Sequence, residues 1–239
     1  MVLIRSLIYF SLLVLTIVLF GVVAGILGLL GFNRSADYIS TKWGASNGVL
    51  LHWVCGLKVN IQGAEHLSND AAIIMSKHQS AWETIYLRGF FRPEQSWILK
   101  QELMRIPIFG WALKAAKSIP IDRSAGREAI KVLTEKGIEY LNEGRNVIIF
   151  PEGTRTPPGS RQKYNIGGGI LANKSGYPVI PIAHNAGVFW RRNDIRKYPG
   201  TIQVVIGPAI ETKGKKSSQI MKEVEDWIET QQENLPLER

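Results

Sequence analysis

The sequence has very little cysteine and no cluster of metal-binding residues. Cys55 is the only cysteine in 239 residues, so no intramolecular disulfide can form. No group of cysteine, histidine and carboxylate residues has the spacing of a metal site, and we therefore expect no metal. Signatures of nucleic-acid-binding modules are also lacking, which argues against nucleic acid as a partner. Neither an internal repeat nor a low-complexity segment interrupts the chain.

Negative charge is also scarce. The 29 lysine and arginine residues outnumber 20 aspartate and glutamate residues, which gives a formal net charge of +9 and a pI of about 9.7. A chain this basic is attracted to anionic partners. With nucleic acid disfavoured, an anionic membrane surface or an acidic protein partner remains.

Charged residues are absent from Leu7 to Phe32. This apolar run is long enough to cross a hydrocarbon core of roughly 30 Å. The alternative is a signal peptide, whose apolar part would be about 7–15 residues long and would precede a small-residue cleavage site. The run exceeds that length and ends in Gly31-Phe32-Asn33-Arg34, so we favour a retained anchor. A kinked or re-entrant anchor is also possible, because the run contains four glycines: Gly21, Gly25, Gly28 and Gly31.

The chain is expected to divide into two parts. Residues 1–57 would form the membrane anchor and an amphiphilic connector, in which 49–57 could lie on the membrane face. Residues 58–239 would form the folded domain that follows. The distribution of lysine and arginine around the apolar run favours a cytoplasmic location for that domain.

Beyond the apolar run, short apolar segments alternate with helical patterns. This alternation predicts an α/β fold, a mostly parallel sheet flanked by helices, with an N-terminal anchoring helix or helical hairpin. The expected strands are 58–62, 71–76, 96–99, 119–121, 146–150, 179–183 and 201–206. The expected helices are 82–88, 126–142, 168–174 and 218–231.

The stretch Lys77-His78-Gln79-Ser80-Ala81-Trp82-Glu83 directly follows an expected strand. An imidazole at a strand end can accept a proton near neutral pH, and a carboxylate can orient it. Five residues on one α-helix would place the two side chains about 140° apart. His78 must therefore lie on the turn before the helix, with Glu83 in its first turn. Alternatively, Ser80 and Glu83 form a capping box and Glu83 has no catalytic part.

Further stretches supply candidate cations at strand ends. Phe150-Pro151-Glu152-Gly153-Thr154-Arg155 follows a strand, with a glycine for a tight turn and an arginine for a phosphate. Asp122-Arg123 could add a second guanidinium or be only a surface pair. Lys100 is a further candidate, although an isolated lysine is usually solvated. His184, after the strand with Pro181, is expected to be a hydrogen-bonded core residue.

These stretches, in this order between about Lys58 and Pro208, resemble the glycerolipid acyltransferases, in particular bacterial 1-acylglycerol-3-phosphate acyltransferases. The resemblance implies that His78 is the catalytic base and Glu83 its partner, although the family usually has aspartate there. It also implies a substrate-binding set, with Pro181 matching the proline of the last family block. That set is Lys100, Arg123, Glu152, Gly153, Thr154 and Arg155.

The implied reaction is direct acyl transfer from acyl-CoA or acyl carrier protein to the 2-hydroxyl of lysophosphatidic acid. The product would be phosphatidic acid for phospholipid synthesis. No cofactor is implied beyond the thioester co-substrate, and the basic surface would hold the enzyme on anionic lipids. Other acceptors, glycerol 3-phosphate or another lysolipid, remain open. A serine esterase that uses Ser80 is a second alternative, although the sequence contains no G-x-S-x-G elbow. A third alternative is a lipid-binding module without catalytic activity.

Overall fold

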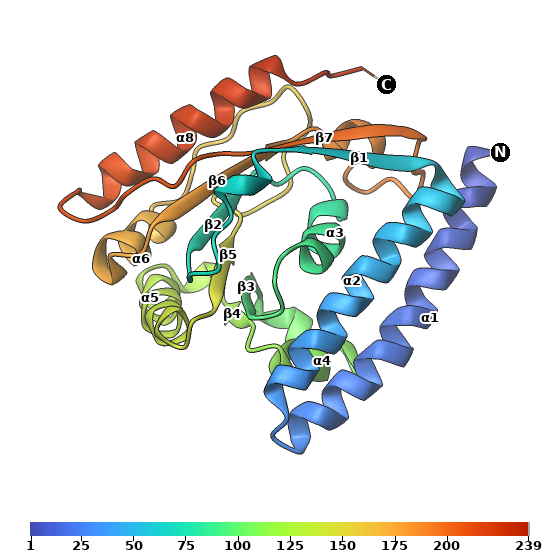
Figure 1. Cartoon of the computed structure of the whole chain (residues 1–239), viewed down its shortest axis with the longest axis horizontal. Helices are drawn as coiled ribbons and strands as arrows, with labels where there is room; N and C mark the ends of the chain where they lie inside the picture. Colours follow the sequence, from blue (N-terminus) through green and yellow to red (C-terminus); the bar gives the residue numbers. More distant parts are fainter. Residues whose placement is uncertain (239) are drawn as a thin grey trace.

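The chain forms a sheet with helices on both faces, preceded by two long antiparallel helices (Figure 1). The structure, a computed structural model, describes residues 1–238, with the side chain of Arg123 excepted. The α-helices are α1 (Val2–Leu29), α2 (Asn33–Cys55), α3 (Trp82–Phe90), α4 (Phe109–Ala115), α5 (Arg127–Asn142), α6 (Gly167–Ser175), α7 (Ala186–Phe189) and α8 (Ser217–Asn234). Short 3-10 helices are η1 (Ala64–His66), η2 (Gln101–Arg105) and η3 (Arg123–Ala125).

The sheet contains seven strands in the order β1-β7-β6-β2-β5-β3-β4. All neighbouring pairs are parallel except β6 and β7. The strands are β1 (Leu57–Gln62), β2 (Ile73–Ser76), β3 (Gln95–Lys100), β4 (Ile119–Ile121), β5 (Asn146–Ile149), β6 (Val179–His184) and β7 (Gly200–Ile206). The predicted strands and the mostly parallel sheet are confirmed, and the predicted helices lie within a few residues of α3, α5, α6 and α8. The sequence patterns did not predict α4.

Alternate residues of the central strands enter different cores. Ile74 and Ile148 pack toward α2 and α3, whereas Ile73 and Val147 face the core formed with α5, α6 and α8. A strand points successive side chains to opposite faces, so a sheet covered on both faces requires continuous apolar strands. This explains why the central strands are so rich in isoleucine and valine.

The N-terminal apolar run is a continuous helix folded back on α2 as a hairpin, not a kinked segment. Its glycines allow close packing against α4: a Cβ at Gly28 would lie 2.4 Å from the Cβ of Ala115. At the other end, the Ser6 hydroxyl accepts the Lys197 N–H at 2.8 Å. Both ends of α1 therefore contact the domain that follows.

A buried ion-pair cluster joins α2 to the sheet. Both oxygens of Asp37 accept hydrogen bonds from the guanidinium of Arg145, at 2.5 and 2.9 Å, and Arg88 lies 3.4 Å from the same carboxylate. All three side chains are buried. Such a cluster fixes how α2 docks, because any other docking would leave charge buried without a partner.

Asp37→Ala should lower the free energy of unfolding by about 3–5 kcal/mol, since it leaves two buried guanidinium groups without their carboxylate. Asp226→Ala, which breaks the exposed pair with Lys222, is the control and should change stability little. Denaturant titration in detergent micelles measures both. Equal effects of the two substitutions would contradict a locking role for Asp37.

Candidate active site

His78 lies just beyond the carboxyl end of β2, with its ring against the side chain of Glu83. His78 Nδ1 is 2.8 Å from Glu83 Oε1, and the ring stacks on Phe150 with centroids 4.1 Å apart. As the spacing predicted, His78 precedes α3 and Glu83 lies in its first turn. Since a carboxylate can only accept, Nδ1 donates and Nε2 is left unprotonated in the neutral ring. That tautomer is the one a general base needs.

Glu83 is fully buried, and its Oε1 also accepts the main-chain N–H groups of Gln79 and Ser80, each at 2.7 Å. Burial opposes ionisation, but hydrogen bonds and the neighbouring histidine rings outweigh it and hold the pKa of Glu83 below its ordinary value. The same oxygen thus serves the helix N-terminus and the imidazole. Both contacts that the sequence predicted for Glu83 are therefore made by one carboxylate oxygen, and the capping contact does not exclude a role beside His78.

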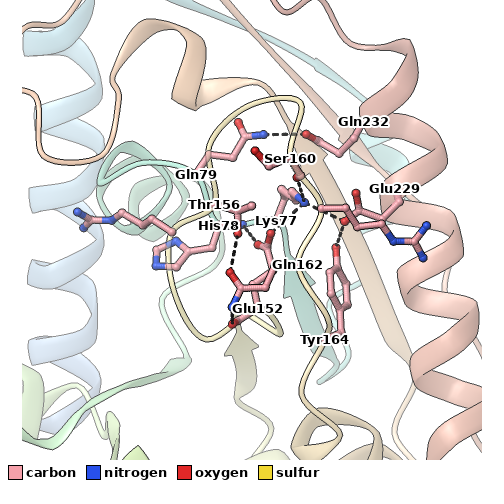
Figure 2. Close-up of polar contacts among 12 residues, drawn as sticks. Lys77, His78, Gln79, Glu152, Thr156, Ser160, Gln162, Tyr164, Glu229 and Gln232 are labelled. Carbon is pink, nitrogen blue, oxygen red and sulfur yellow. Dashed lines mark hydrogen bonds and ion pairs between the residues drawn. The ribbon is translucent and has the colours of Figure 1, made fainter.

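The main chain of His78 is held by the loop after β5. Its N–H donates to Glu152 Oε2 at 2.6 Å, and its carbonyl accepts the Thr156 N–H at 2.8 Å (Figure 2). Gly153 makes the turn between them with φ of 71°, and a Cβ there would lie 2.9 Å from the Asn165 amide. A glycine is therefore required for the loop to close around His78.

A cavity of about 580 Å³ opens beside the His78 ring. Its polar end is lined by His78, Lys100, Gly153, Thr154, Arg155 and Arg192. Its apolar part runs between the hairpin and the sheet, with Leu13, Ile17 and Phe20 of α1 facing Trp97 and Leu103. The cavity therefore suits a molecule with an anionic head and a hydrocarbon chain. Another hollow of about 640 Å³, around Arg34 and Lys117, does not include His78.

The cations at the polar end lack acidic partners. Among the residues that the structure describes, no carboxylate lies within ion-pair distance of Lys100, Arg155 or Arg192. Arg192 donates to the Arg155 carbonyl at 3.1 Å, which brings the two side chains to one rim. Cations gathered at a cavity mouth without counter-charges have the chemistry to bind an anion.

Other predicted residues lie elsewhere. Glu152 is buried behind His78 and is absent from the cavity lining, since it pairs with Lys77 at 2.9 Å. The side chain of Arg123 lies outside the described part of the chain. His184 is buried, with Nε2 2.9 Å from the Lys77 carbonyl and Nδ1 accepting from Ala186 N–H, so it is the satisfied core residue that we expected. In residues 1–238, no His, Cys, Asp and Glu side chains are grouped to hold a metal ion.

Ser80 does not fit the esterase alternative. It is fully buried, outside the cavity lining, and its Oγ accepts the Trp82 N–H at 3.1 Å. The residues that the sequence did not reveal are Arg192 and the α1 side chains that form a cavity wall. No motif surrounds Arg192, and nothing in an apolar run tells a wall residue from a lipid-facing one.

Comparisons with known proteins agree with this geometry. The family model described as Acyltransferase matches residues 58–185. A 1-acyl-sn-glycerol-3-phosphate acyltransferase from Pseudomonas aeruginosa is 43% identical over 215 residues, 88% of this chain and 83% of that protein. The protein of the same name from Limnanthes douglasii is 29% identical over 211 residues, 85% of this chain and 72% of that one.

A crystal structure of a 1-acyl-sn-glycerophosphate acyltransferase from Thermotoga maritima superimposes with a TM-score of 0.81 at 24% identity. The match covers 98% of this chain and 95% of that one, which shows that the two share a fold, hairpin included. Together, the family match and the Pseudomonas relative establish the family on sequence alone. The chain therefore belongs to the Acyltransferase family and is an acyltransferase.

Proposed function

We propose that the protein transfers a fatty acyl group from an acyl thioester to the 2-hydroxyl of 1-acylglycerol 3-phosphate and so makes phosphatidic acid. The observation that carries this is the His78–Glu83 pair at a cavity that is cationic at its mouth and apolar inside. A lysophosphatidate offers a phosphate and a hydroxyl, and the acyl groups of the substrates are hydrocarbon. The names of the relatives support the same acceptor.

In the proposed reaction, His78 Nε2 removes the proton of the 2-hydroxyl as its oxygen attacks the thioester carbonyl. Glu83 stabilises the imidazolium that forms. When the tetrahedral intermediate collapses, the C–S bond breaks and the imidazolium returns its proton to the departing thiolate. The balance is one new ester and one free thiol, with no cofactor besides the acyl-CoA or acyl carrier protein that supplies the acyl group.

The phosphate of the acceptor would bind at Arg155 and Arg192, with Lys100 as a further cation at the same mouth. Gly153 and Thr154 line this end through the loop that carries Arg155. We assign Glu152 to holding the His78 main chain, since its carboxylate does not reach the cavity.

We propose that the hairpin holds the enzyme in the surface of a bacterial inner membrane, with the catalytic domain on the cytoplasmic side. By length and composition α1 could cross a bilayer. It also contacts the domain at Ser6 and again at Gly28, which favours a helix that stays packed on the domain over one that leaves it to span. Its outer face exposes Leu15 (53%) and Leu19 (55%), an apolar surface suited to lipid.

His78→Ala should lower kcat at least about a hundredfold, the lower range for loss of a general base. His66→Ala is the control and should retain activity, because the His66 ring contacts the Ile206 carbonyl and does not line the cavity. Mass measurement of phosphatidic acid formed from lysophosphatidate and an acyl thioester gives the rates. Near-normal turnover by a folded His78→Ala protein would exclude this mechanism.

Glu83→Gln should lower both kcat and stability, because one oxygen serves the ring and the helix N-terminus. The folded pKa of Glu83 lies below its ordinary value of 4.5, so its ionisation stabilises the fold above that pH. This stabilisation disappears as pH falls through the folded pKa. Thermal melts from pH 7 to pH 3 should show an acid-dependent loss that is smaller in Glu83→Gln. Identical pH dependence of the melting temperature in the wild-type and Glu83→Gln proteins would contradict this role of the Glu83 carboxylate.

Arg155→Ala should raise the KM for lysophosphatidate about ten- to hundredfold, the range for a lost charge-assisted hydrogen bond, and Arg192→Ala less. The KM for the thioester should stay unchanged. Arg161→Ala, which removes an exposed arginine paired with Glu225, is the control. A raised KM for the thioester alone would assign these arginines to the acyl donor instead.

Replacing Leu15 and Leu19 together by lysine should release the protein from vesicles, since both side chains point away from the cavity. Point substitutions are preferable to deleting α1, because deletion would remove the cavity wall at Leu13, Ile17 and Phe20. Co-sedimentation with anionic vesicles in low and high salt measures binding, with Gln219→Lys on α8 as the control. Undiminished binding of the double variant would contradict a lipid-facing α1.

A further inference from the structure

Lys77, the residue before His78, has no part in the proposed chemistry, yet it is among the largest fully buried side chains. Its Nζ lies 2.9 Å from Glu152 Oε1, 2.8 Å from Glu229 Oε1 and 3.5 Å from the Ser160 carbonyl (Figure 2). A buried ammonium is costly unless it is paired. The role of Lys77 is therefore to be found in the groups that pair with its ammonium.

The first partner leads directly to the catalytic histidine. While Oε1 of Glu152 faces Lys77, Oε2 accepts the His78 N–H at 2.6 Å. One carboxylate thus connects the Lys77 ammonium to the main chain of the next residue. This hydrogen bond is strongest when Glu152 is ionised. Burial raises the pKa of Glu152, and the ion pair with Lys77 is the largest influence that opposes the rise.

The second partner comes from the C-terminal helix, beyond the residues that the family model matches. Glu229 Oε1 also accepts the Tyr164 hydroxyl at 2.8 Å, so it is fixed from two sides. One turn on, Gln232 accepts the Gln79 amide N–H at 2.7 Å. Helix α8 therefore contacts the residues on both sides of His78, as Figure 2 shows.

We propose that Lys77 is a positioning residue for acyl transfer: held by Glu229 of α8, it keeps Glu152 in place as the acceptor that fixes the His78 main chain. The inference rests on the proposed function, because it takes His78 as the base. The alternative is that the cluster only fastens α8 to the sheet. In that case its loss would lower stability but leave the kcat of the folded protein unchanged.

The pH dependence of kcat separates these roles. The groups that face Glu152 are Lys77, the main chain of His78 and Thr156, with Tyr164 and Glu229 beyond the lysine. Without the ammonium, a buried Glu152 takes up a proton at higher pH and becomes a weaker acceptor. The acid limb of the Lys77→Met profile should therefore move to higher pH. In Lys77→Met/Glu152→Gln the group that accepts the His78 N–H no longer titrates, so the limb should return to its wild-type position.

The experiment uses the full chain in detergent micelles, with lysophosphatidate and an acyl thioester both varied. Lys77→Met should lower kcat about ten- to hundredfold with both KM values within about twofold, the effect of a misplaced catalytic group. Glu229→Gln, nearly isosteric, should lower kcat less. Glu225→Gln is the matched control: it lies one turn earlier on α8 and pairs with the exposed Arg161 at 2.9 Å, so kcat should not change.

Wild-type kcat and pH profile in folded Lys77→Met and Glu229→Gln would overturn the inference, and so would raised KM values with kcat unchanged. If Lys77→Met does not fold, Glu229→Gln decides by the same kcat criterion. His78→Ala separates the two proposals. If it stays active, the proposed function fails, whereas an inactive His78→Ala beside an unaffected Lys77→Met overturns only the role of Lys77.

Discussion

His78 is held from three directions at the carboxyl end of β2: its ring by Glu83, its N–H by Glu152 and its carbonyl by Thr156. A histidine on a turn is otherwise free to rotate about its main chain. Here Glu83 comes from α3, and Glu152 and Thr156 come from the loop after β5. That loop lies beside His78 because β2 and β5 are parallel neighbours that end at one edge of the sheet. The candidate active site therefore depends on the register of β2 and β5 as much as on the histidine itself.

Carboxylates and cations occupy different places around His78. Glu83 and Glu152 are buried, each with hydrogen-bond donors that offset the cost of burial. Lys100, Arg155 and Arg192 lie at the cavity mouth. The buried carboxylates thus fix geometry, whereas the unpaired cations remain available for a ligand.

Helix α1 of the hairpin presents one face to the domain and another face outward. Leu13, Ile17 and Phe20 face the cavity, and Leu15 and Leu19 face outward. The buried cluster of Asp37, Arg145 and Arg88 sets where this pair of helices docks. An apolar interface alone tolerates sliding, but a buried carboxylate with its guanidinium partners does not. The cavity wall and the outward apolar surface of α1 are therefore placed together.

Much of this protein could be predicted from the sequence, because the relevant signals are local. Apolar runs such as Ile73–Ser76 predict strands covered on both faces, and the five-residue spacing requires His78 and Glu83 to meet across a helix start. The order of the motifs indicated the family. The division at residues 57 and 58 into anchor and catalytic domain stays a prediction, although β1 begins at Leu57.

Only the tertiary structure decided which side chains face the cavity and which hold the others in place. Glu152 lies in the motif with Arg155, yet it turns inward to Lys77 while the arginine lines the mouth. Arg192 and Glu229 have no motif around them and reach the site from segments distant in sequence. The glycines of α1 are explained by α4, which no periodicity had revealed. These outcomes depend on contacts between segments far apart in the chain, and local sequence patterns carry no information about such contacts.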